Sequence, residues 1–226
     1  MKYTAVLATA LLATVAHADT VFDNLPAALP GNYPSLGYQA TQTSEFGNRI
    51  GLGGTARLLN SITVGMSSWA TGAPGTTFTH DLTINIYGAG SGNAPGALLG
   101  TSTQTFTMPY HDGTNGFSGT AFLATFNLAS LSLTLPDQIV IGLAYNTANY
   151  GANPMGSNGP WNSLNFGLIA SAPTVGTDLD PDDVMWNTST AGWYTDGGAA
   201  GVGVFRQDTN WTGYAPAIRV DAISSV

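Results

Sequence analysis

The stretch "DLTINIYG", residues 81–88, decides the fold class, because apolar and polar residues alternate along it without a break. Its apolar residues would share one side of an extended chain: Leu82, Ile84 and Ile86. Its more polar residues would share the other: Thr83, Asn85 and Tyr87. A period of two is typical of a strand with one buried face. The stretch therefore predicts a β-strand whose apolar side faces a core.

The same alternation recurs along the chain. It is clearest in "NSITVGMSSW" (60–69), "TAFLATFNL" (120–128) and "QIVIGLAYNT" (138–147). Shorter candidate strands lie at 101–108, 163–170, 201–208 and 216–223. Loops rich in Gly, Asn and Pro separate them, and no helical periodicity is sustained after Ala18. This pattern predicts an all-β protein: a two-sheet antiparallel β-sandwich, jelly-roll-like in character.

The first 18 residues, "MKYTAVLATALLATVAHA", have the three parts of a secretory signal peptide. Lys2 gives a positive start, an apolar run covers 5–15, and an A-x-A cleavage pattern ends at Ala18. The apolar run is too short to cross a bilayer. We expect cleavage after Ala18 and a secreted, extracellular protein with one β-sandwich domain at 19–226.

Composition narrows the possible functions. Cysteine is absent, which excludes a Cys-ligated metal site and a thiol nucleophile. Cleavage would remove Lys2 and leave four arginines against 13 acidic residues, a formal charge of −9. Such a surface repels phosphate groups, so binding to nucleic acid or to anionic membranes is not expected. No long apolar stretch follows Ala18, so no membrane span is predicted in the mature chain.

Four aspartates crowd the segment "TDLDPDDVMWN", residues 177–187: Asp178, Asp180, Asp182 and Asp183. Alternating carboxylates in a loop can bind Ca²⁺. An EF-hand is excluded, because Val184 stands where the turn glycine is needed and Ser189 replaces the bidentate glutamate. Two interpretations remain. One is a calcium site outside the EF-hand class. The other, which we favour, is a solvated turn whose aspartates cap their own backbone.

Glu45 is the only glutamate of the chain. Hydrolysis of a polysaccharide needs two carboxyl groups across a cleft, so Glu45 would have to act with one aspartate of 178–183. The alternative is a structural Glu45 that pairs with Arg49 or Arg57 or caps a strand. His80 and His111 each precede an aspartate, and no G-x-S-x-G nucleophile motif is present. Both histidines are therefore predicted to be loop or strand-end residues.

Aromatic residues gather near the C-terminal end, within a region rich in Asn, Asp and Gly. They are Trp186, Trp193, Tyr194, Trp211 and Tyr214. Flat rings next to amide and carboxylate groups suit a sugar-binding platform, because the rings stack on C–H faces and the polar groups bond hydroxyls. The alternative is that these rings cover the open ends of the sandwich.

Three stretches together resemble a family of exported, mostly bacterial proteins of unknown function. They are "VFDNLP…GNYPSLGYQATQTSEFGNRIGLGG" (21–54), "LPDQIVIGLAYNTANYG" (135–151) and "VMWNTSTAGWYTDGGAAGVGVFRQDTNWTGYAPAIRV" (184–220). Some relatives are similar to the extracellular modules of PEP-CTERM and choice-of-anchor proteins. The C-terminus here has no Pro-Glu-Pro motif, apolar span or basic cluster. The resemblance implies a secreted β-sandwich and favours release over anchoring.

Taken together, the sequence favours a secreted, non-enzymatic β-sandwich that acts in extracellular binding or as a surface or matrix component. A polysaccharide or cell-surface glycan is the expected ligand, if it has one. The two alternatives are a polysaccharide hydrolase that uses Glu45 and a module stabilised by Ca²⁺.

Overall fold

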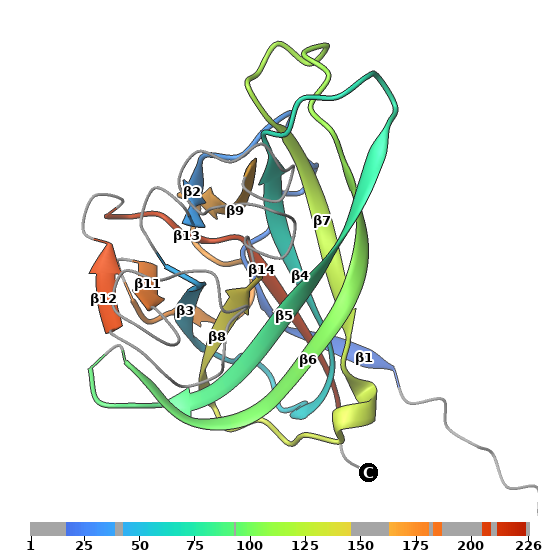
Figure 1. Cartoon of the computed structure of the whole chain (residues 1–226). Coiled ribbons are helices and arrows are strands. Elements are labelled where there is room, and N and C mark those ends of the chain that lie inside the picture. Colours follow the sequence, from blue (N-terminus) through green and yellow to red (C-terminus); the bar gives the residue numbers. More distant parts are fainter. Residues whose placement is uncertain are drawn as a thin grey trace, which may run out of the picture.

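The computed structural model describes residues 17–38, 43–92, 94–145, 163–180, 183–186, 205–208 and 212–224. These residues form two antiparallel sheets that pack face to face (Figure 1). The first sheet has the order β1 (Ala18–Asp23), β14 (Ile218–Ile223), β4 (Leu58–Ser68), β9 (Leu164–Ile169) and β13 (Ala215–Pro216), with β2 (Ser35–Gly37) on β9 and β7 (Thr120–Asn127) on β4. The second has the order β12 (Phe205–Asp208), β11 (Asp183–Trp186), β3 (Glu45–Gly51), β8 (Gln138–Ala144), β5 (Thr77–Ala89) and β6 (Pro95–Pro109), with β10 (Thr177–Asp178) on β3. A short 3₁₀ helix, η1 (Ala129–Leu131), follows β7. The predicted all-β sandwich is confirmed.

The core lies between the two sheets. The predicted inward residues of β5 are fully buried: Leu82, Ile84 and Ile86. They belong to the same apolar cluster as the alternate residues of β4: Ile62, Val64 and Met66. Phe106 of β6 and Phe126 of β7 join the sheets at one side, with ring centroids 4.8 Å apart. Alternation along each strand therefore produced the buried layer that it predicted.

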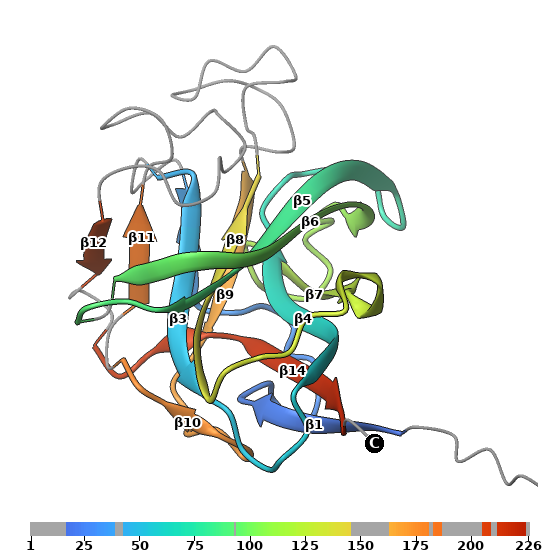
Figure 2. The ribbon, with the colours of Figure 1, turned by 90° about the horizontal axis from the view of Figure 1, so that it is seen from below.

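The outward face of β5 differs from the expectation for a half-exposed strand. Asn85 and Tyr87 are both fully buried although they point away from the core side. The long hairpin of β5 and β6 curves toward β3, where the Arg49 guanidinium donates to the Gly92 carbonyl at the hairpin turn (Figure 2). The outer face of the second sheet is thus partly buried, and the side chains buried there carry polar groups.

One tyrosine covers part of the outer face of the first sheet, over β4 and β9. Tyr33, which precedes β2, lies against Gly65 of β4 and Gly167 of β9. A Cβ on Gly65 would come within 2.9 Å of the Tyr33 ring, and a Cβ on Gly167 within 2.8 Å. Tyr33 is 3% exposed, and its hydroxyl has no hydrogen-bond partner. Burial raises the pKa of Tyr33 to about 12.

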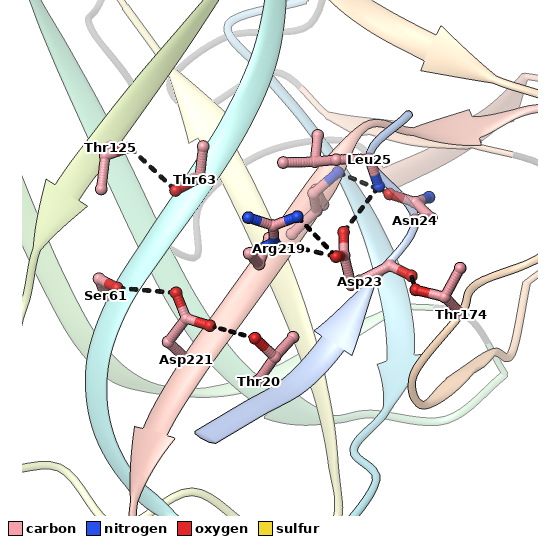
Figure 3. Close-up of polar contacts among 11 residues, drawn as sticks. Thr20, Asp23, Asn24, Leu25, Ser61, Thr63, Thr125, Thr174, Arg219 and Asp221 are labelled. Atoms are coloured by element: carbon pink, nitrogen blue, oxygen red, sulfur yellow. Dashed lines mark hydrogen bonds and ion pairs between the residues drawn. The ribbon is translucent and has the colours of Figure 1, made fainter. Parts of the chain in front are cut away.

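The first and last strands are held together by side chains as well as by the ladder (Figure 3). The Arg219 guanidinium donates to Asp23 Oδ2 through Nε at 2.9 Å and Nη2 at 2.7 Å. Asn24 extends the ladder, because its Oδ1 accepts from the Ile218 N–H at 2.7 Å. Residues 1–16 of the predicted signal peptide lie outside the described residues, and cleavage after Ala18 would remove only the first residue of β1.

Candidate functional site

The acidic segment begins in β10 and is more buried than a solvated turn. Asp178 Oδ1 accepts from the Asp180 N–H at 3.1 Å, which is the backbone capping expected of an aspartate turn. It also accepts from Asn48 Nδ2 at 3.1 Å. Asp180 is only 1% exposed. Desolvation raises the pKa of the Asp178 carboxyl, and the bonds from Asp180 and Asn48 oppose that shift. The expected backbone capping is seen at Asp178, and Asp180 is buried where a solvated side chain was expected.

Of the other two predicted metal ligands, only Asp183 belongs to the described residues. Asp183 opens β11, where it pairs with Asp208 of β12, and Asp182 lies outside the described residues. Among the described residues, no three His, Asp or Glu side chains come together closely enough to hold a metal ion.

Glu45 begins β3 and is fully buried on the outer face of the second sheet. Its Oε1 accepts from Asn85 Nδ2 at 2.9 Å and from the Tyr87 hydroxyl at 3.0 Å, and Oε2 lies 3.1 Å from the same hydroxyl. Asn85 is held in turn, because its Oδ1 accepts from Thr101 Oγ1 at 2.7 Å. The carboxyl group is thus part of a bonded network that crosses β3, β5 and β6.

Gly142 of β8 makes the space for this carboxyl group. A Cβ at that position would overlap Glu45 Oε1 and stand 2.8 Å from its Cδ. The expected partners of Glu45 bond elsewhere: Arg57 pairs with Asp137 at 2.8 Å, and Arg49 donates to Gln138 Oε1 at 2.8 Å. A fully buried carboxyl group bonded by Asn85 and Tyr87 serves packing and has no face open to a polymer.

The predicted aromatic region is only partly described. Trp186 ends β11 directly opposite Glu45 in the register of β3. Tyr214 is half-buried and packs against the main core cluster, as the end-covering alternative expected. Trp193, Tyr194 and Trp211 lie outside the described residues. The sugar platform predicted for the five aromatic residues therefore stays a prediction.

Two exposed rings elsewhere were missed by the sequence analysis. Trp69, which follows β4, is 44% exposed, and Phe117, between β6 and β7, is 54% exposed. The Phe117 ring lies over Gly31, where a Cβ would come within 2.6 Å of it. The Trp69 indole nitrogen lies beside Gly119, 2.9 Å from where a Cβ would stand. Both loops lie at the same end of the sandwich, above β4 and β7 in Figure 1.

One asparagine holds the loop that carries Phe117. Asn115 Nδ2 donates to the carbonyls of Gly31 and Gly119, both at 2.9 Å. Its Oδ1 accepts from the Phe117 N–H at 3.0 Å. The Trp69 backbone is fixed in a similar way, since its N–H donates to the Ser163 carbonyl at 2.8 Å. Trp69 and Phe117 are therefore exposed rings on fixed backbone, and we call them the aromatic pair.

The sequence did contain a signal for the aromatic pair. "SSWATGAPG" and "GTNGFSGT" each place one ring in a loop rich in Gly, Ser, Thr and Asn, the same signal that singled out Trp193 and Trp211. What the sequence could not show is that the loops that carry residues 69 and 117 lie at the same end of the fold.

The histidines occupy two different environments. His111 follows β6, and its Nδ1 lies 3.4 Å from Thr120 Oγ1, so the predicted loop position is confirmed. His80 is instead the fourth residue of β5 and 3% exposed, so it is a buried residue within a strand and not the loop or strand-end residue that was predicted. Its ring packs edge-on against Tyr145 with centroids 5.7 Å apart. The alternating strand puts residue 80 on the inward side with Leu82.

Comparison with known proteins adds no relative: no family model, no curated protein and no solved structure matches the chain. Within the described part of the chain, no helix has both the length and the apolar character needed to cross a bilayer. The fold and the class of protein are thus defined by the structure alone, as a two-sheet antiparallel β-sandwich.

Proposed function

We propose that this chain is a secreted, non-enzymatic β-sandwich that binds extracellular carbohydrate at the aromatic pair. The observation that carries the proposal is that Trp69 and Phe117 are 44% and 54% exposed at the same end of the sandwich. Exposed apolar surface that gathers in one place, rather than single exposed side chains, marks interaction sites on proteins. A pyranose ring offers a C–H face that stacks on an aromatic ring.

The fixed backbone under the aromatic pair favours binding. The three hydrogen bonds of Asn115 hold the Phe117 loop before any ligand arrives. Less conformational entropy is then lost on association. Exposed Thr114 and Ser118 lie on either side of Phe117 in the chain and can bond sugar hydroxyls. The site is therefore suited to a polar ligand with one apolar face.

The state of Glu45 supports a non-enzymatic protein. A glycosidase acid must reach the glycosidic oxygen of its substrate. The Glu45 carboxyl group is fully buried and bonded by Asn85 and Tyr87. This arrangement stabilises the outer face of the second sheet and offers no proton to an external polymer.

Export is the remaining part of the proposal, and it rests on the sequence of residues 1–18. Expression of the full chain and of a chain lacking 1–18 tests it. We expect the full chain in the medium or periplasm with an N-terminus at Asp19, and the shortened chain inside the cell. Equal retention of both chains would contradict secretion.

Binding is tested by affinity electrophoresis of the mature protein through gels that contain cellulose derivatives, xylan, β-glucan, mannan or soluble chitin. We expect retardation by at least one polymer. Trp69→Ala and Phe117→Ala should each weaken it about fivefold, since a stacked ring contributes on the order of 1 kcal/mol. Leu123→Ala is the matched control, because Leu123 is 48% exposed on β7 and outside the aromatic pair.

Three outcomes contradict the proposal. If no polymer retards the protein, carbohydrate is excluded as its ligand. Retardation that survives in both ring variants but is lost in Trp193→Ala or Trp211→Ala moves the site to the region first predicted from sequence. Release of reducing sugar by the wild type, with Glu45→Gln inactive, makes the protein a hydrolase.

A further inference from the structure

Asn48 of β3 is the starting point of a second site, away from the aromatic pair. The residue is fully buried, and its Nδ2 donates to Asp178 Oδ1 at 3.1 Å. Its Oδ1 is also buried, and it has no hydrogen-bond partner. Buried amide oxygens are nearly always bonded, because leaving one unbonded costs the energy of desolvation. An unbonded oxygen on an amide that already contacts a carboxylate indicates a missing electropositive partner.

The path of the chain brings further oxygen atoms to Asn48. Asp178 pairs with Ile50, and Val184 pairs with Gly47 on the same strand. Asp178 and Val184 are thus six residues apart, whereas their partners on β3 are only three residues apart. The Leu179 N–H continues the ladder by donating to the Arg49 carbonyl at 3.1 Å, which leaves Asp180 at the level of Asn48. Asp180 is 1% exposed, and its N–H contacts Asp178 Oδ1.

The charge at this place is negative. Among the described residues, the two ion pairs are Arg57–Asp137 and Arg219–Asp23, and neither includes Asp178. The partners of the Asp178 carboxyl are the Asn48 amide and a backbone N–H. Burial of a carboxylate is costly unless a cation or several donors compensate it. A bound metal ion would supply that charge.

We propose that Asn48, Asp178 and Asp180 bind one Ca²⁺ ion at the edge of β3. Asn48 Nδ2 holds the Asp178 carboxylate at 3.1 Å, and the unbonded Oδ1 of the same amide can bind an ion beside that carboxylate. Ca²⁺ takes such carboxylate and amide oxygens at about 2.4 Å. Backbone carbonyls and water complete the shell of six to eight oxygens that this ion takes.

The donor set selects among metals. It contains two carboxylates and one amide oxygen, with no sulfur and no imidazole. Hard oxygen donors suit Ca²⁺ and Mg²⁺ and disfavour Zn²⁺. Mg²⁺ keeps most of its water and demands octahedral geometry, whereas Ca²⁺ accepts irregular sets supplied by loops. The ion would fasten the segment between β10 and β11 to β3, far from the loops above β4 and β7 (Figure 1).

Thermal melts of the mature protein in CaCl₂ and in EGTA are the first test. Because Ca²⁺ would bind only the folded chain, a hundredfold excess over its Kd should raise the Tm by about 5 to 10 °C. MgCl₂ at the same ionic strength should raise it far less. Isothermal titration with CaCl₂ gives the Kd directly and should show one site per chain.

Asp178→Asn separates a metal site from a fold defect. Without Ca²⁺ this variant should melt no lower than the wild type, because it removes a buried charge and keeps the shape of the side chain. With Ca²⁺ it should lose the rise in Tm and weaken binding at least tenfold. Asp112→Asn is the matched control: Asp112 Oδ1 accepts the Thr114 N–H at 2.9 Å in the same kind of turn, in an exposed loop.

Each result either supports or overturns the proposed metal site. Equal melts of the wild type in CaCl₂ and EGTA, or no heat of binding, would overturn the proposal. The same Ca²⁺ response in Asp178→Asn as in the wild type would place the ion elsewhere and overturn it as well. Loss of the response in Asp178→Asn but not in Asp112→Asn supports it. None of these results depends on carbohydrate binding.

Discussion

The two sheets each bury a polar side chain over a glycine on their outer face, but they treat its polar atoms differently. On the first sheet, Tyr33 lies over Gly65 and Gly167, and its hydroxyl is unbonded. On the second, Glu45 lies over Gly142, and its carboxyl group is bonded by Asn85 and Tyr87. The shared device is a strand glycine that leaves room for a large neighbour.

The difference shows what each contact contributes. Tyr33 contributes by packing alone, because its ring contacts the glycines and its hydroxyl makes no hydrogen bond. The Glu45 contact is one of both shape and hydrogen bonding, so it should be the more sensitive to substitution. An unbonded buried group is cheap to remove, whereas removing one partner of a buried bond leaves the other unsatisfied. Four measurements test this difference between the Tyr33 and Glu45 contacts.

Gly142→Ala should have the largest effect. The new Cβ would overlap Glu45 Oε1, so the carboxyl group must leave its donors or the strands must part. We expect the free energy of unfolding to fall by about 3–5 kcal/mol, measured by urea denaturation. Gly88→Ala on β5 is the control, because the nearest atom to its Cβ is 3.9 Å away. A similar loss in both variants would mean that strand glycines matter here for backbone reasons.

Tyr87→Phe should come second. It removes the hydroxyl that lies 3.0 and 3.1 Å from the two oxygens of Glu45 and keeps the ring in place. The carboxyl group then lacks a buried donor, and we expect a loss of about 1–3 kcal/mol in the free energy of unfolding. A change below about 0.5 kcal/mol would show that water or another donor replaces the hydroxyl.

Tyr33→Phe is the same substitution at the unbonded tyrosine. Because the hydroxyl makes no hydrogen bond, its removal should change the free energy of unfolding by less than about 0.5 kcal/mol, with stabilisation the favoured sign. Denaturation side by side with Tyr87→Phe measures the contrast. A loss as large as that of Tyr87→Phe would show that the Tyr33 hydroxyl has a partner in solution and would end the comparison.

The smallest effect appears only in alkali. The folded pKa of Tyr33 is about 12, against an ordinary value of 10.0. Since the folded pKa is the higher one, the folded chain keeps this proton longer, and stability falls as the pH rises from about 10 to about 12. Tyr33→Phe should fall less steeply than the wild type in urea titrations between pH 9 and 11.5. Tyr38 and Tyr145, whose pKa values burial also raises, contribute equally to both proteins.

The long strands were predictable because their pattern is complete. β4, β5, β7 and β8 each have three successive apolar residues on the inward side, and each was found from sequence. β3 was missed because Asn48 interrupts the inward series between Phe46 and Ile50. Its polar side chain is needed to meet Asp178, so the residue that hides the strand also belongs to the proposed metal site.

The candidate sites were less predictable than the fold, because they depend on register. Glu45 meets Asn85 and Tyr87 from a strand about 40 residues distant, and only the pairing of β3 and β5 with β8 brings them together. The aromatic pair likewise joins residues 69 and 117 through loops that face one end of the sandwich. Local pattern indicates which residues are unusual, and tertiary contact decides which of them meet.

The pairing of β1 with β14 constrains the order in which the chain can fold during synthesis. The ribosome delivers β1 almost 200 residues before its partner strand, so Asp23 must wait for Arg219 and Asn24 for Ile218. Pairings so distant in sequence form late and slowly. The first sheet can therefore close only after Ile218–Ile223 has been synthesised.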